Sequence, residues 1–149
     1  MTGNAKNTSP AITSVSVMKR KTVIVGMLFI IAFLHIVGIG SWLSGYWRNL
    51  YSSYFSDVAL PFSFYFLLCA NQFRLPLLRH WIAKAAIVFA LASAAETFQY
   101  FGVYALGVTF DPVDYLMYGV GVMLAAVVDT QVFSRIFKFW MIQPQEVMQ

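Results

Sequence analysis

Apolar residues fall into four long runs along the chain, separated by short polar or aromatic segments. The runs cover about residues 22–42, 58–74, 81–102 and 112–130. An α-helix rises about 1.5 Å per residue, so roughly 20 apolar residues cross the ~30 Å hydrocarbon layer of a bilayer. The second run is short for a span, but aromatic and basic residues at its ends can extend it. The pattern predicts an all-α, polytopic membrane protein with four transmembrane helices.

The segments outside the four runs have different characters. Residues 1–18 are polar and predict a flexible cytoplasmic tail, and residues 141–149 predict a C-terminal tail. Residues 41–56 are rich in Trp, Tyr and Phe, which gather at the headgroup level of a membrane. They predict a short helix in the interface, with stacking on a sugar or lipid headgroup as the alternative. Apolar residues keep helical spacing after Asp129, which predicts an amphipathic continuation on the cytoplasmic membrane surface.

Composition supports the bilayer as the solvent of this chain. Of its 149 residues, 60% are hydrophobic and 11% are charged, whereas soluble domains have about 45–50% apolar and about 25% charged residues. The net charge of +4 comes from scattered side chains, so the clustered basic face of a nucleic-acid-binding protein is not predicted. The single cysteine, Cys69, lies in an apolar run and is interpreted as a small buried thiol.

Basic residues predict the orientation of the four spans. Residues 19–21 precede the first run, and further basic residues flank the turn between runs two and three and follow run four. The two loops on the opposite side hold only Arg48. Because cytoplasmic loops carry an excess of Lys and Arg, both termini are predicted to be cytoplasmic. In this scheme Lys84 snorkels to the cytoplasmic surface.

Acidic residues gather at the opposite, extracytoplasmic end of the predicted bundle. Asp57 starts the second run, Glu96 lies well inside the third, and Asp111 and Asp114 start the fourth. A charged carboxylate inside a span costs roughly 2.5–3.5 kcal/mol, so Glu96 needs partners. The candidates are Gln99, Tyr100, Tyr118 and His35. Two interpretations stay open: a packing hydrogen bond, or a site for a cation, a proton or the polar head of a lipid.

Residues 111–114 (Asp-Pro-Val-Asp) form a helix-start signature. Asp111 is predicted to cap the helix with Pro112 at its first position, and Phe110 and Tyr115 are predicted to form a hydrophobic staple. A role of Asp114 in a binding site is the alternative. Farther along this run Gly119 and Gly121 predict a close approach of a neighbouring helix.

The sequence does not favour an enzyme. It contains no nucleophile–base motif and no phosphate-binding loop. Glu96 and Asp114 form a carboxylate pair without a His or Cys ligand set, so the pattern predicts neither a metal nor a cofactor.

Glu96-x-x-Gln99, Phe110-Asp111-x-x-Asp114 and Gly121 together resemble the C-terminal signature of the VanZ-like family. The resemblance covers about residues 81–129, and Asp57 and Tyr65 match an acid and a tyrosine of the family's second helix. It implies a small multi-span protein of the bacterial inner (cytoplasmic) membrane. The founding member of the family is linked to glycopeptide (teicoplanin) resistance.

The chain departs from the family pattern at two positions. No Arg stands between Gln99 and Asp111, and Tyr118 replaces a common Asn. If the family binds an anionic headgroup through that Arg, this chain lacks the residue for such binding.

Three functions follow as hypotheses. The first is a VanZ-like cell-envelope protein with an extracytoplasmic polar pocket for a lipid or envelope ligand. The second is an accessory or assembly subunit of a larger membrane complex, and the third, weaker one is a small ion or proton transporter that uses Glu96. Expected partners are membrane lipids, with a homo-oligomer or a larger complex as open alternatives. The residues predicted to line the pocket are Glu96, Gln99, Asp111, Asp114 and Tyr118.

Overall fold

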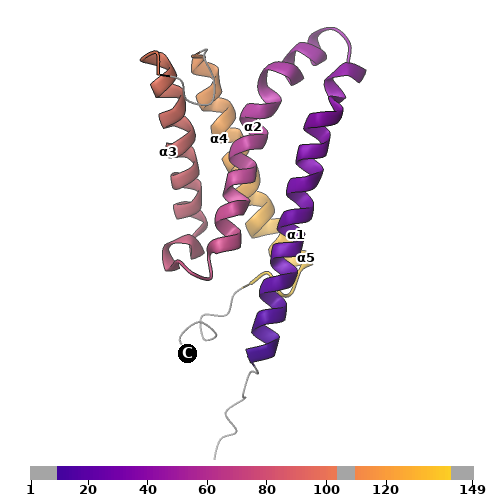
Figure 1. Cartoon of the computed structure of the whole chain (residues 1–149), viewed down its shortest axis with the longest axis vertical. Helices are drawn as coiled ribbons and strands as arrows, with labels where there is room; N and C mark the ends of the chain where they lie inside the picture. Colours follow the sequence, from indigo (N-terminus) through magenta and orange to yellow (C-terminus); the bar gives the residue numbers. More distant parts are fainter. Residues whose placement is uncertain (1–9, 104–109, 142–149) are drawn as a thin grey trace, which may run out of the picture.

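The computed structural model describes residues 10–103 and 110–141, and this part of the chain is all-α. Its four long helices are α1 (Pro10–Val37), α2 (Tyr46–Asn71), α3 (Trp81–Tyr100) and α4 (Pro112–Val127) (Figure 1). Short 3-10 turns, η1 (Ile39–Trp42) and η2 (Pro76–Arg79), lie in the first two connections. Four helical segments are long and apolar enough to cross a membrane, which confirms the predicted four-span fold.

The first two helices are longer than the hydropathy pattern predicts. α1 begins at Pro10, inside the segment interpreted as a tail, because proline suits the first turn of a helix. α2 begins at Tyr46, directly after Gly45 with its positive φ of 58°. The aromatic residues from Tyr46 onward therefore form the first turns of α2 and not a separate interfacial helix.

Pro61 lies in the interior of the 26-residue α2, not near its start. A proline has no N–H, so the carbonyl of Asp57 loses its helical hydrogen-bond partner. The turns before Pro61 lean toward α1 (Figure 1). Because α2 begins at Tyr46 and not near residue 58, the second span is longer than the apolar run that predicted it.

The fourth span does not continue along the membrane surface as predicted. α4 runs into a π-helical turn, η3 (Val128–Phe133), and a last short turn, α5 (Ser134–Ile136). Phe137 then takes extended backbone angles and ends the helix. Residues 137–140 form a C-terminal hook that returns to the bundle, where Trp140 is 3% exposed. Phe133, Phe137 and Trp140 of the amphipathic pattern pack into the core, whereas Val132 and Ile136 stay exposed.

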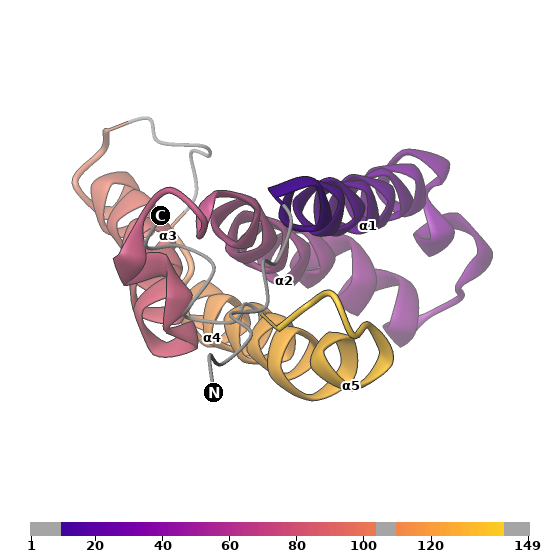
Figure 2. The ribbon, with the colours of Figure 1, turned by 90° about the horizontal axis from the view of Figure 1, so that it is seen from below.

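α2 is the central helix and packs against α1, α3 and α4 (Figure 2). α1 lies at the edge and packs mainly on α2. α2 and α4 approach closely at Gly121, where an added Cβ would lie 2.3 Å from the carbonyl oxygen of Val58. This contact confirms the predicted role of Gly121, whereas a Cβ on Gly119 would meet only Phe89, at 3.8 Å. The buried core combines Ile24, Tyr65, Phe66, Cys69, Val88, Val122, Ala125, Ala126 and Trp140.

The start of α1, the α2–α3 turn and the hook lie at one end of the bundle (Figure 1). Two basic residues of that end, Arg20 and Lys84, are buried inside the bundle. The exposed basic residues there are Lys19, Lys21, Arg74, Arg79, Arg135 and Lys138. In the described residues of the opposite end, Arg48 is the basic side chain. The charge asymmetry therefore persists when only exposed side chains are considered.

We expect a reporter enzyme fused after Gln149 to be active in the cytoplasm, because the exposed cations mark that side. The same reporter fused after Gly102, at the end of α3, is expected on the opposite side. Activity of alkaline phosphatase and of a cytoplasmic reporter at both positions measures the orientation. Extracytoplasmic activity after Gln149 would contradict the four-span orientation.

Candidate functional site

Glu96 is the buried carboxylate at the end of the bundle that lies opposite the start of α1 and the hook. It is 1% exposed. Its Oε1 accepts a hydrogen bond from the backbone N–H of Asp111 at 2.8 Å, and its Oε2 accepts one from the Tyr118 hydroxyl at 3.1 Å. The predicted Tyr118 partner is therefore confirmed, and Glu96 joins α3 to the start of α4.

Asp111 caps α4 as the sequence signature predicts. Its Oδ1 accepts a hydrogen bond from the backbone N–H of Val113 at 2.9 Å. The rings of Phe110 and Tyr115 lie edge to face with centroids 6.3 Å apart, which matches the predicted staple. The cap places the backbone N–H of Asp111 against Glu96, so one short segment serves both the helix and the buried carboxylate.

Glu96, Asp57, Asp111 and Asp114 form what we call the carboxyl cluster. Asp57, Asp111 and Asp114 are half-buried, and the four carboxyl groups interact electrostatically. Gln99, a predicted site residue, is half-buried one turn beyond Glu96 on α3.

Two other predicted partners of Glu96 contact aromatic rings. His35 stacks on Phe55 with centroids 6.0 Å apart, and Tyr100 contacts Phe110 at 5.1 Å. Within residues 10–103 and 110–141, no group of three or more His, Cys, Asp or Glu side chains is arranged to hold a metal ion. The carboxyl cluster offers acceptor oxygens and negative charge to a polar ligand.

A second polar cluster, which the sequence analysis did not predict, lies at the end of the bundle that holds the hook. Its centre is Asp129, in the π-helical turn after α4. Oδ2 of Asp129 lies 2.5 Å from Lys84 Nζ and accepts a hydrogen bond from the Tyr65 hydroxyl at 2.9 Å. Oδ1 accepts a hydrogen bond from Trp140 Nε1 at 2.7 Å and lies 3.7 Å from Arg20 Nη2.

Lys84 is 2% exposed, so the prediction that it snorkels to the surface is wrong. Besides its ion pair with Asp129, its Nζ donates to Gln72 Oε1 at 3.3 Å and to Cys69 Sγ at 3.1 Å. Cys69 is buried as predicted, but its sulfur contacts a cation. We call Arg20, Lys84 and Asp129, with Tyr65, Cys69, Gln72 and Trp140, the ion-pair cluster.

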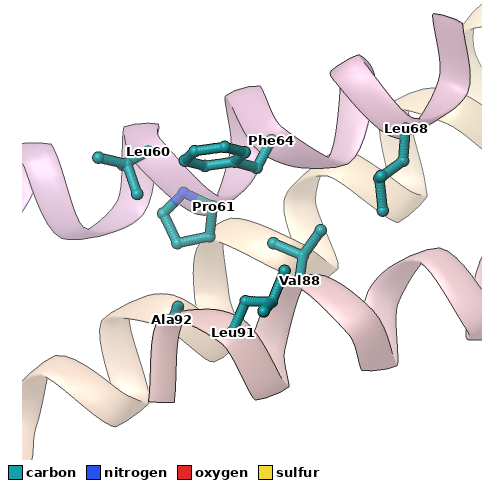
Figure 3. Close-up of a pocket in the computed structure, with 7 residues that line it drawn as sticks. All are labelled: Leu60, Pro61, Phe64, Leu68, Val88, Leu91 and Ala92. Carbon is teal, nitrogen blue, oxygen red and sulfur yellow. The ribbon is translucent and has the colours of Figure 1, made fainter. Parts of the chain in front are cut away.

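A pocket of about 120 Å³ lies between α2 and α3 (Figure 3). The ring of Pro61 points from α2 toward α3, with Val88 and Ala92 on the facing helix (Figure 3). The pocket is lined by Leu60, Pro61, Phe64, Leu68, Val88, Leu91 and Ala92. This pocket has no ionisable side chain, so it offers apolar contacts and no catalytic group.

The fold and its two polar clusters define a small, four-span α-helical membrane protein. Comparisons of the chain with family models, curated proteins and solved structures find no match. The resemblance to the VanZ-like family therefore rests on the sequence motif alone.

Proposed function

We propose that this chain is a small VanZ-like membrane protein of the cell envelope. In this proposal the carboxyl cluster binds a lipid or an envelope-derived ligand from the extracytoplasmic side, and no chemical step is assigned to it. The observation that carries the proposal is the burial of Glu96 within a span, beside three further carboxyl groups. Intramembrane ionisable residues are costly and commonly mark functional sites.

The charge of the carboxyl cluster favours a ligand with a positively charged group. No Lys or Arg occurs between Lys84 and Arg135, so this stretch supplies no basic side chain to balance Glu96, Asp111 and Asp114. Glu96 is fixed by two hydrogen bonds, whereas Asp57 and Asp114 are half-buried. An amine-bearing headgroup would donate hydrogen bonds to Asp57 and Asp114. The buried Glu96 would add negative charge to the site.

Removal of two carboxylates tests this proposal. We expect the double variant Glu96→Gln, Asp114→Asn to lose an envelope-stress or glycopeptide-resistance phenotype of the wild-type chain. Both changes keep the side-chain size and one acceptor oxygen, and the Tyr118 hydroxyl can accept a hydrogen bond from the new amide NH2, so the bundle should still form. Growth under envelope stress measures the effect, with the amount of membrane-inserted protein determined in parallel.

Thr97→Val is the matched control for the double variant. Thr97 is exposed at the same end of α3, and its hydroxyl is within hydrogen-bonding distance of the Tyr115 hydroxyl, at 2.8 Å. The control removes a polar group there without changing charge, and we expect full function. Full function in the double variant would contradict a ligand site at the carboxyl cluster.

An accessory role in a larger membrane complex is the second candidate. A groove of about 390 Å³ between α1 and α2 supports it, because His35, Ser56 and Ser63 line it among apolar residues. Polar side chains facing lipid are unfavourable, and a partner helix would cover them. Purification in a mild detergent tests whether the chain belongs to a larger complex. Co-purification of a stoichiometric partner supports the accessory role, and a particle made of this chain alone contradicts it.

A further inference from the structure

The ion-pair cluster buries more positive than negative charge. Arg20, Lys84 and Asp129 are 1%, 2% and 6% exposed. An arginine side chain stays protonated in proteins, and one carboxylate neutralises only one of the two cations. A buried charge without a partner is strongly unfavourable, so one more negative charge would stabilise the cluster.

The unsatisfied positive charge lies on Arg20. Lys84 has three acceptors, at Asp129, Gln72 and Cys69. Arg20 Nη1 donates to the carbonyl of Trp140 at 2.7 Å, but Nη2 is 3.7 Å from Asp129, beyond hydrogen-bonding distance. Arg20 Nε is buried and has no hydrogen-bond partner. The guanidinium group thus keeps an unused donor edge.

Two aromatic side chains flank this guanidinium group. Its Cζ lies 4.2 Å from the ring centroid of Trp140 and 5.7 Å from that of Phe73. Phe73 belongs to the turn after α2, and Trp140 belongs to the hook. Arg20 is 1% exposed, so a phosphate group reaches it only when Phe73 or the hook moves aside.

We propose that Arg20 binds a phosphate group at the cytoplasmic end of the bundle, supplied by an anionic phospholipid or by free phosphate. A phosphodiester carries one negative charge, which equals the surplus of the cluster. The planar guanidinium fork matches phosphate oxygens and binds them through paired hydrogen bonds. Other exposed cations of this end, such as Arg74 and Lys138, attract anionic headgroups to this level of the membrane.

The wild-type protein provides the first test. We would place it, free of native lipid, in nanodiscs of phosphatidylcholine alone, in nanodiscs that also contain phosphatidylglycerol, and in phosphatidylcholine nanodiscs with inorganic phosphate or chloride at equal ionic strength. We expect the unfolding temperature to rise and saturate with phosphatidylglycerol or with phosphate. A response to phosphatidylglycerol alone identifies a lipid, and a response to phosphate identifies the free anion. The same unfolding temperature in all media would overturn the proposal.

Two adjacent substitutions provide the second test. Arg20→Gln removes the buried cation, and Lys21→Gln removes an exposed cation from the next residue, so both variants change the net charge equally. Native mass spectrometry measures bound phospholipid. We expect Arg20→Gln to bind about tenfold more weakly or worse, and Lys21→Gln to stay near the wild type. Equal losses in both variants would indicate general surface electrostatics and overturn a specific site; if Arg20→Gln fails to fold, the wild-type test decides.

Discussion

Asparagine in place of Asp129 is expected to lower the free energy of unfolding by about 3–5 kcal/mol, because a buried ion pair loses one partner. Lys84 would stay 2% exposed with no carboxylate beside it. Trp140 Nε1 and the Tyr65 hydroxyl would compete for the one remaining amide oxygen. Denaturant titration in detergent micelles, followed by circular dichroism, measures the loss.

Two controls separate this effect from a general sensitivity of the bundle. Asp114→Asn changes a half-buried carboxylate at the opposite end and should alter the free energy of unfolding by less than about 1 kcal/mol. The double variant Lys84→Met, Asp129→Asn removes both charges of the pair. Its free energy of unfolding should fall by less than the sum of the two single-variant losses. Each single variant leaves one charge of the pair buried without its partner, whereas the double variant leaves neither. Strictly additive losses would contradict a coupled ion pair.

Hydropathy predicted the number of spans because three runs have the length of a helix that crosses the hydrocarbon layer, and aromatic and basic residues extend the shorter second run. It could not predict where α2 begins. The residues from Tyr46 to Phe55 are amphipathic and suit both an interfacial helix and the first turns of a span. The path of the hook was also ambiguous, because Trp140 continues a helical spacing although the helix ends at Ile136.

The carboxyl cluster was largely predictable because its signals are local. Asp111 caps a helix that starts one residue later, and Glu96 lies unusually deep in an apolar run. The hydrogen bond from Tyr118 to Glu96 was predictable because the two helices that carry them are joined by a short connection. The backbone N–H of Asp111 as the second partner needed the structure, because apolar patterns do not place backbone donors.

The ion-pair cluster escaped prediction because its partners are distant in sequence. Lys84 and Asp129 are 45 residues apart, and a lysine near the end of a span reads as a topology signal. One clue was present. Asp129 is the single described carboxylate at the basic end, and antiparallel neighbours place the start of α3 beside the end of α4. A lone acid at such a position predicts a buried basic partner.

Alanine in place of Gly121 is expected to lower the free energy of unfolding by about 1–3 kcal/mol, as overpacking of a tight contact does. An added Cβ would lie 2.3 Å from the carbonyl oxygen of Val58 and 3.1 Å from its carbonyl carbon. These are backbone atoms of α2, so no side chain can rotate away, and α2 and α4 must move apart. Unfolding in detergent, measured as for Asp129, gives the loss.

Gly119→Ala is the matched control, two residues away on the same helix. Its Cβ would lie 3.8 Å from the ring of Phe89, an ordinary van der Waals contact. Alanine is better than glycine inside a helix by roughly 0.5–1 kcal/mol, so this variant should be neutral or slightly more stable. Opposite signs in the two variants would show that the contact with Val58, and not helix propensity, requires Gly121. Equal effects would contradict the close approach of α2 and α4 at this position.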